Sequence, residues 1–140
     1  MSTPLLVWNP FTNNLDYAGQ GGSGGPSFPG GVSAWTDVTG TTQLMAVNNG
    51  YTADNNSVPV VFSLPTTCAY GKVFRVVGKG TGGWVIQANA GQTIHFGIVD
   101  TSSGGTISSN NQYDCIEILC TLQDTGFTVI SGPQGDLDYT

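Results

Sequence analysis

Lys72–Ala88 reads KVFRVVGKGTGGWVIQA and decides the fold class, because it places two strand-forming runs on either side of a glycine-rich segment. Both runs are rich in β-branched and aromatic residues, as β-strands are. Glycines between them permit the positive φ angles that a tight hairpin connection requires. A glycine-rich loop can also bind phosphate, but only ahead of a helix, and here Trp84-Val85-Ile86 continues as a strand. The stretch therefore predicts two strands and a tight turn, and it argues against a phosphate-binding loop.

The first run, Lys72–Val77, alternates in the manner of a strand with one buried face. Phe74 and Val76 are predicted to point inward, but Val73 and Val77 make the opposite face half apolar as well. A sheet that is apolar on both faces indicates either the centre of a sandwich or a subunit interface.

A second long strand is predicted over Tyr113–Leu122. Its expected core face holds Asp114, Ile116, Ile118, Cys120 and Leu122, and its other face holds Cys115, Glu117, Leu119 and Thr121. Cys115 and Cys120 thus face opposite sides and are poorly placed to bridge each other. With Cys68 the chain has 3 cysteines, so at least one thiol is free or pairs between chains, and buried free thiols are the expected state.

The same pattern recurs along the chain, bounded by clusters of glycine, asparagine and serine. Further strands are predicted over Leu5–Trp8, Ala34–Val38, Gln43–Val47, Val58–Leu64, Thr93–Phe96 and Phe127–Ile130. Turns are predicted at Asn48-Asn49-Gly50 and Asn89-Ala90-Gly91, and no long segment free of glycine and proline has helical spacing. The fold class is therefore all-β, as a single β-sandwich or a jelly-roll-like antiparallel domain.

A glycine-rich stretch divides the chain. Residues 19–31 read GQGGSGGPSFPGG, which is typical of a flexible linker. The predicted organisation is an N-terminal extended assembly segment (1–18), a Gly/Pro-rich linker (19–32) and a β-sandwich domain (33–140). Within the assembly segment, Leu5–Phe11 carries five large apolar residues: Leu5, Leu6, Val7, Trp8 and Phe11. Exposing all of them is unfavourable, so the segment either folds back or docks on a neighbouring subunit, and the hinge beside it favours the neighbour.

Charge excludes several partners. The net charge is −6, and only Lys72, Arg75 and Lys79 are positive, which is too few for an extended nucleic-acid footprint or an anionic membrane surface. No window has the length of apolar sequence that a membrane span needs. The N-terminal residues lack the basic region of a signal peptide. We therefore expect no nucleic acid and no membrane insertion.

Residues for catalysis or metal binding are sparse. His95 is the only histidine, no serine lies in a nucleophile-elbow sequence, and Asp114 and Glu117 fall on opposite faces of one strand. The cysteine spacing does not fit zinc. Two groups of residues carry the oxygen ligands that calcium prefers: Asp54, Asn55 and Asn56, and Asp136 and Asp138. Turn formation explains both groups equally well. The sequence predicts no enzyme and no cofactor.

Aromatic residues are the stronger candidates for a binding role, because Trp and Tyr rings stack on the apolar faces of sugars and anchor protein interfaces. The candidate ligand or interface aromatics are Trp84, Trp35, Tyr51, Tyr70 and Tyr113. Packing in the core or at an interface is the alternative role of each.

Several short motifs carry a family resemblance. They include VNNGY (47–51), FSLP (62–65), FRVVGKG (74–80), GGW (82–84), NAGQTIHFG (89–97) and NQYD (111–114). Through them, the stretch from Trp35 to Ser131 resembles a β-rich module of bacteriophage tail-fibre and related appendage proteins. WNPFTNNLDY (8–17) likewise resembles the short tags that precede glycine-rich linkers in such proteins. The resemblance implies a homo-oligomer, often a trimer, on a virion or extracellular appendage, and it transfers no catalytic residue.

Together these observations predict a structural subunit of a homo-oligomeric fibre-like appendage, of the phage tail-fibre type. Two alternatives stay open. One is a carbohydrate-binding receptor-recognition module that serves host attachment through a cell-surface glycan. The other is a filament subunit linked to the next by donation of its N-terminal strand.

Overall fold

The computed structural model describes residues 5–9, 14–18, 31–131 and 135–140, and all regular structure in them is β-strand. The predicted all-β class is confirmed. The strands are β1 (Leu5–Asn9), β2 (Asn14–Ala18), β3 (Ala34–Val38), β4 (Thr42–Leu44), β5 (Asn49–Ala53), β6 (Val60–Ser63), β7 (Val73–Gly78), β8 (Trp84–Gln87), β9 (Thr93–Phe96), β10 (Val99–Asp100), β11 (Thr106–Ser109), β12 (Cys115–Leu122), β13 (Gly126–Val129) and β14 (Leu137–Tyr139). In the described ranges, no helix has the length and hydropathy of a membrane span.

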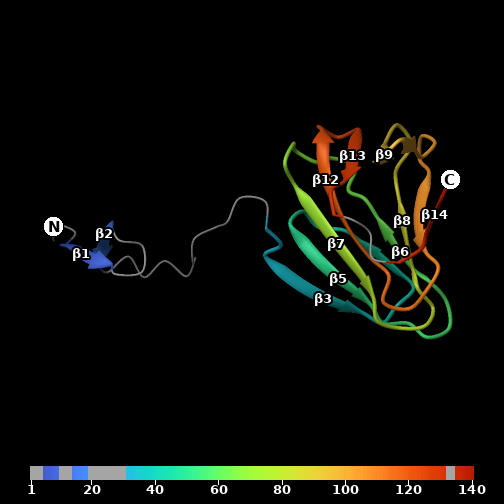
Figure 1. The fold of residues 1–140 in the computed structure, drawn as a ribbon, viewed down its shortest axis with the longest axis horizontal. Helices are drawn as coiled ribbons and strands as arrows, with labels where there is room; N and C mark the ends of the chain where they lie inside the picture. Colours follow the sequence, from blue (N-terminus) through green and yellow to red (C-terminus); the bar gives the residue numbers. More distant parts are fainter. Residues whose placement is uncertain (1–4, 10–13, 19–30, 132–134) are drawn as a thin grey trace.

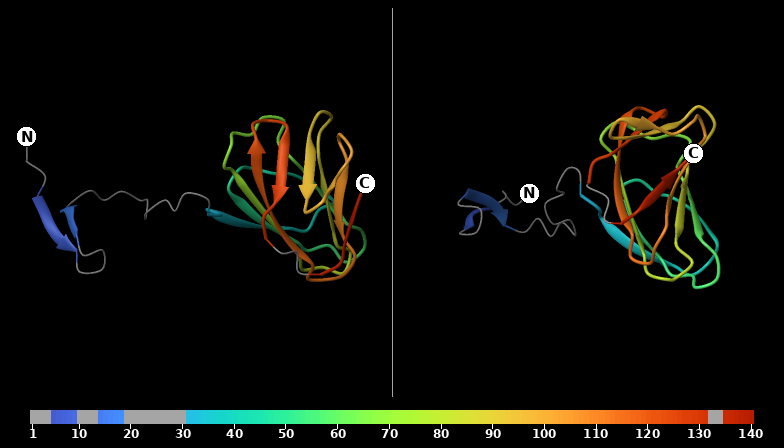
Figure 2. Two further views of the ribbon diagram at one scale, coloured as in Figure 1. Left: turned by 45° about the horizontal axis from the view of Figure 1, so that its top comes forward. Right: turned by 45° about the vertical axis from the view of Figure 1, so that its right-hand side comes forward.

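The strands of the body form two sheets, shown in Figures 1 and 2. One has seven strands in the order β10-β9-β13-β12-β7-β5-β3, and the other has five in the order β14-β11-β8-β6-β4. From β3 to β8 the chain alternates between the sheets, so that β3, β5 and β7 run parallel in one sheet and β4, β6 and β8 run parallel in the other. β9 and β13 form a further parallel pair. The other pairs of the body are antiparallel.

The expectation of an antiparallel domain is therefore wrong for both sheets, which are mixed. Apolar alternation records which face of a strand is buried, and it does not record the direction of the neighbouring strand. Parallel pairs arise here because each strand returns to its sheet by way of the other sheet. A jelly-roll, which is an antiparallel architecture, is not supported by these pairings.

The hairpin predicted within Lys72–Ala88 is also wrong. Its two predicted strands exist as β7 and β8, but they lie in different sheets and are not a hairpin. Of the glycines between them, only Gly83 has a positive φ, of 75°. Gly80 and Gly82 of this connection instead permit close approach to the backbone of Asn55, where a Cβ atom would clash.

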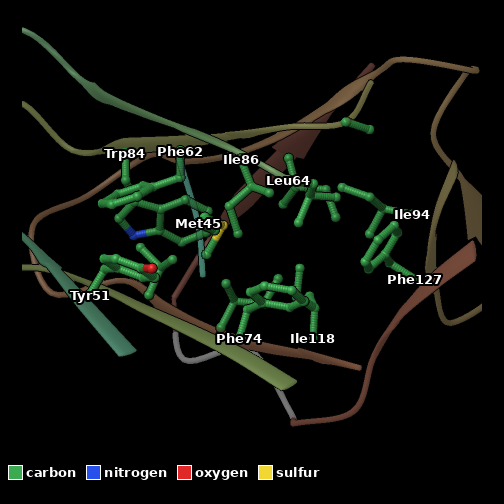
Figure 3. Close-up of a cluster of buried hydrophobic side chains, with 14 of the residues drawn as sticks. Met45, Tyr51, Phe62, Leu64, Phe74, Trp84, Ile86, Ile94, Ile118 and Phe127 are labelled. Carbon is green, nitrogen blue, oxygen red and sulfur yellow. The ribbon is translucent and has the colours of Figure 1, made fainter. Parts of the chain in front are cut away.

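Side chains from both sheets form one core (Figure 3). Tyr51 packs on Phe62 with ring centroids 5.4 Å apart, and Phe74 meets Phe127 at 6.1 Å. The first contact joins the two sheets, and the second joins β7 and β13 within the seven-stranded sheet. Aromatic pairs at such separations stabilise a core beyond the area they bury.

The predicted core faces of β7 and β12 are confirmed with one exception. Phe74 and Val76 are buried, as are Asp114, Ile116, Ile118 and Cys120. Leu122 is 59% exposed instead. The register with β13 shifts between Cys120 and Leu122, and such an irregularity re-aims the side chains beyond it.

Five strands were not predicted from the sequence, and they are polar or short: β2, β5, β10, β11 and β14. The clearest case is β5, since Asn48-Asn49-Gly50 was predicted to be a turn. Only Asn48 adopts the left-handed conformation, with φ 59°, and the strand begins at the next residue.

At the N-terminus, β1 and β2 form an antiparallel hairpin that pairs Leu5 with Ala18 and Asn9 with Asn14. This hairpin is a separate two-stranded sheet. Phe11 and residues 19–30 lie outside the described residues. The division into assembly segment, linker and domain, and the assembly role of Leu5, Leu6, Val7 and Trp8, stay predictions.

Candidate interaction site on the seven-stranded sheet

Two of the five candidate aromatics lie in the core. Trp84 and Tyr51 are each 1% exposed. The Trp84 indole N–H donates to the backbone carbonyl of Asp114 at 2.8 Å, and the Tyr51 hydroxyl accepts from the backbone N–H of Ala46 at 2.6 Å. A buried ring cannot stack on a ligand. Trp84 and Tyr51 are therefore core residues, which was the alternative role predicted for each, and not ligand-binding aromatics.

The other three aromatics are exposed but are not gathered into one site. Tyr70 is 73% exposed between β6 and β7, and Tyr113 is 66% exposed ahead of β12 with φ 69°. Trp35 is 55% exposed on β3, the outer strand of the seven-stranded sheet (Figure 1). Of the five, only Trp35 lines the hollow described next.

Trp35 lies against Gly50 of the neighbouring strand. A Cβ atom at position 50 would sit 2.6 Å from carbon atoms of the indole ring, so any larger residue there would displace it. The register continues across the sheet as Trp35, Gly50, Arg75 and Glu117, all on its outer face. The missing side chain of Gly50 thus lets the ring rest on the sheet beside Arg75.

An open hollow of about 490 Å³ lies on this outer face. Its lining residues are Trp35, Arg75, Val76, Val77, Cys115, Ile116, Glu117 and Ser131. Arg75 and Glu117 form an ion pair whose side chains are 43% and 17% exposed, and the backbone N–H of Glu117 donates to the Ser131 hydroxyl at 2.8 Å. The hollow combines an apolar ring with a fixed donor and a fixed acceptor, which suits recognition of a polar molecule with one apolar face.

A second charged cluster lies at the end of β3. The Lys79 ammonium contacts Asp37 at 2.9 Å and Asp54 at 2.7 Å, and the Thr52 hydroxyl donates to Asp37. The hydrogen bond from Thr52, followed by that from Lys79, lowers the pKa of Asp37. Asp54 and then Asp37 raise the pKa of Lys79. The cluster fixes the outer-face side chain of Asp37 beside β5.

Lys79→Met tests this cluster. Because the folded-state pKa of Asp37 is lowered, its contribution is present above the unfolded value of about 3.9 and is lost as pH falls through the folded value. We expect Lys79→Met to lower the urea midpoint slightly at pH 7, and the difference from wild type to shrink below about pH 4 as Asp37 protonates. A difference that stays the same at pH 7 and pH 3 would contradict the coupling.

The remaining candidate ligands have local partners. His95 contacts Asp100 across the β9–β10 pair at 2.6 Å, and the Asn55 side-chain oxygen accepts from the backbone N–H groups of Ser57 and Val58, which is a turn interaction. Among the residues described, no group of three or more His, Cys, Asp or Glu side chains is placed to hold a metal ion.

The three cysteines are free thiols in two environments. Cys68 and Cys120 are buried, and the Cys120 thiol donates to the Cys68 carbonyl at 3.3 Å. Burial, together with the neighbouring Cys120, raises the pKa of Cys68 to about 12. Cys115 is partly exposed and lines the hollow.

This difference predicts selective labelling, since the thiolate is the reactive form and needs access to solvent. We expect the native protein at pH 8 to react rapidly with one equivalent of a disulfide reagent such as DTNB. Cys115→Ser should abolish the fast phase and leave the two slow thiols, which react on denaturation. Rapid reaction of Cys68 or Cys120 in the folded protein would contradict the burial.

Gly50, Arg75 and Ser131 are parts of the site that no sequence pattern predicted. The parallel pairing of β3, β5 and β7 brings Gly50 and Arg75 beside Trp35. The antiparallel pairing of β12 with β7 and β13 adds Ser131, and no local pattern signals either arrangement. The apolar second face predicted from Val73 and Val77 was the nearest signal, and Val77 does line the hollow.

No protein-family model matches the chain. A search of curated proteins likewise returns no match. The resemblance to bacteriophage appendage proteins therefore stays a prediction from the motifs in the sequence.

Proposed function

We propose that the protein is a structural subunit of a homo-oligomeric fibre-like appendage on a virion or cell surface, with a β-sandwich body built from its two mixed sheets. The trimer implied by the family resemblance is the favoured assembly. The proposal includes an N-terminal segment, residues 1–18, that docks on a neighbouring subunit.

One observation carries this proposal: the hairpin β1–β2 pairs with neither sheet of the body, while the end strands β3 and β4 are paired on one side only. A two-stranded hairpin alone is marginally stable in water. A sheet edge can accept a further strand through its backbone groups. Both features favour association between chains.

Deletion of residues 1–18 tests the proposal. We expect the full-length protein to show a multiple of the 14.5 kDa chain mass by light scattering, and the truncated protein a smaller multiple. Filaments seen by electron microscopy for the full chain alone would favour linkage by strand donation, because a head-to-tail contact that does not close gives filaments. An unchanged mass and unchanged stability after truncation would refute the assembly role of the segment.

The hollow beside Trp35 favours a second candidate, a carbohydrate-binding module. A sugar ring could stack on the exposed indole while Arg75 and Glu117 bind its hydroxyl groups. A glycan-array screen tests this candidate. Binding should be lost in Trp35→Ala and retained in Tyr70→Ala, which removes an exposed ring outside the hollow. Equal binding by both variants would remove the hollow from consideration.

A further inference from the structure

The sheets of the body end in four strands, β10, β3, β14 and β4, and the free edge of β3 can form a contact other than the N-terminal one. β3 pairs with β5 on one side, and no described strand pairs with its other side (Figure 1). Edge strands are commonly protected by proline, lysine, a bulge or a covering loop. β3 reads AWTDV, without proline or lysine, and its register with β5 is unbroken. Its first four residues are exposed. The strand is therefore open to pairing.

The backbone groups at this edge can be assigned. The Val38 carbonyl accepts from the N–H of Asp54, just after β5, at 2.8 Å. Alternate residues of a parallel strand direct both backbone groups to the same neighbour. Ala34, Thr36 and Val38 therefore face β5, and Trp35 and Asp37 direct their N–H and C=O groups to the free edge.

This arrangement is complementary to itself. When two copies of β3 run antiparallel with Thr36 opposite Thr36, Trp35 of each copy lies opposite Asp37 of the other. Both residues have free backbone groups, so each Trp35–Asp37 pair can exchange two hydrogen bonds. The Thr36 pair between them is then the closely spaced, non-hydrogen-bonded pair of the ladder.

We propose that β3 pairs antiparallel with β3 of a second copy about a two-fold axis at Thr36, which joins the two seven-stranded sheets into one. This contact lies between the bodies of the two chains. It stands independently of the N-terminal contact in the proposed function.

The charges at β3 do not oppose this contact, although each chain has a net charge of −6. Asp37 is the only charged residue of β3, and it already contacts Lys79 and Thr52 of its own chain. The two-fold register sets each Asp37 opposite a tryptophan rather than opposite the other carboxylate. Salt should strengthen the dimer by screening the remaining repulsion.

A second copy fits this edge better than the hairpin β1–β2. Pairing of identical strands about a two-fold axis covers both free edges at once and closes the assembly. Addition of the hairpin to β3 would leave the outer edge of the hairpin open. The hairpin is therefore an outcome that the experiment must distinguish.

The first test compares Trp35→Pro with Trp35→Ala in the full chain. Both variants lose the indole, but only proline removes the N–H that points to the free edge, and proline is tolerated at an edge position of this kind. By sedimentation at increasing concentration, we expect Trp35→Ala to dimerise about fivefold more weakly than wild type. Trp35→Pro should lose the β3 contact altogether, so that only the association through residues 1–18 remains, with an unchanged circular dichroism spectrum.

The second test uses charge at the symmetry axis. Thr36 is exposed, so lysine or glutamate can be placed there, and like charges directly opposite destabilise a strand pair. Thr36→Lys and Thr36→Glu should each lose the β3 contact when alone. Mixed in equal amounts, they should form a heterodimer. Only a contact that sets position 36 against itself gives this rescue.

Three outcomes would overturn the proposal. The first is a wild-type chain that shows no association at any concentration. The second is the absence of rescue in the mixture of charge variants. The third is association that survives Trp35→Pro but is lost on deletion of residues 1–18, which would support the N-terminal contact and leave β3 without a role.

Discussion

Trp84→Ala is expected to lower the free energy of unfolding by about 3–5 kcal/mol, the usual cost of removing a large buried aromatic ring. Trp84 is among the largest fully buried side chains, and it packs with residues of both sheets (Figure 3). Its loss leaves a cavity and also leaves the Asp114 carbonyl without its indole donor. Urea denaturation followed by circular dichroism measures the change.

Two further variants separate the causes. Trp84→Phe keeps a ring but removes the indole N–H, and the Asp114 carbonyl then keeps only its bond from the backbone N–H of Gly78. It should therefore cost less than Trp84→Ala, at about 0.5–1.5 kcal/mol for one lost hydrogen bond. Tyr70→Ala removes an exposed ring and should change stability by less than about 0.5 kcal/mol. If Trp84→Ala were as mild as Tyr70→Ala, Trp84 would not be a core residue.

Gly80→Ala is expected to be the second severe substitution, with a cost of about 3 kcal/mol from overpacking. A Cβ atom at position 80 would lie 2.6 Å from both the carbonyl carbon and the nitrogen of Asn55, so backbone would have to move. Gly80 also donates its N–H to the Ala53 carbonyl at 2.8 Å, which holds the two connections together. Urea denaturation and the circular dichroism spectrum measure the change.

Gly40→Ala is the matched control. A Cβ atom at position 40 would meet nothing within 4 Å, and Gly40 has no positive φ. Its substitution should leave stability unchanged or raise it by about 0.4–1 kcal/mol, because alanine restricts the unfolded chain. Equal effects of Gly40→Ala and Gly80→Ala would show that close approach to Asn55 does not constrain the fold.

The roles of Trp84 and Gly80 differ in how far the sequence alone predicts them. For Trp84, the sequence allowed two roles, core packing and contact with a ligand or interface, and it did not choose between them. The value of Gly80 was misattributed, because its local context suggested a tight hairpin turn. The actual constraint comes from Asn55, on a segment that no local pattern links to Gly80.

The candidate site shows the same limit. Trp35 was named from its residue type alone, together with four other aromatics, two of which are buried. Exposure depends on which strands end a sheet, and β3 is an end strand only because the chain alternates between the sheets. Periodicity reports burial along one strand and carries no information about the order of strands.

Local patterns along the chain are sufficient to predict the all-β class, most of the strands with apolar alternation, and the inward faces of β7 and most of β12. These follow from local rules, since side chains alternate across a strand and β-branched or aromatic residues favour it. Long-range contacts, in contrast, set the parallel pairings, the separation of β7 from β8, the row of Trp35, Gly50, Arg75 and Glu117, and the free edge of β3. The physical reason is that these features depend on contacts between residues distant in sequence, and the backbone hydrogen bonds that make them are available to almost every residue.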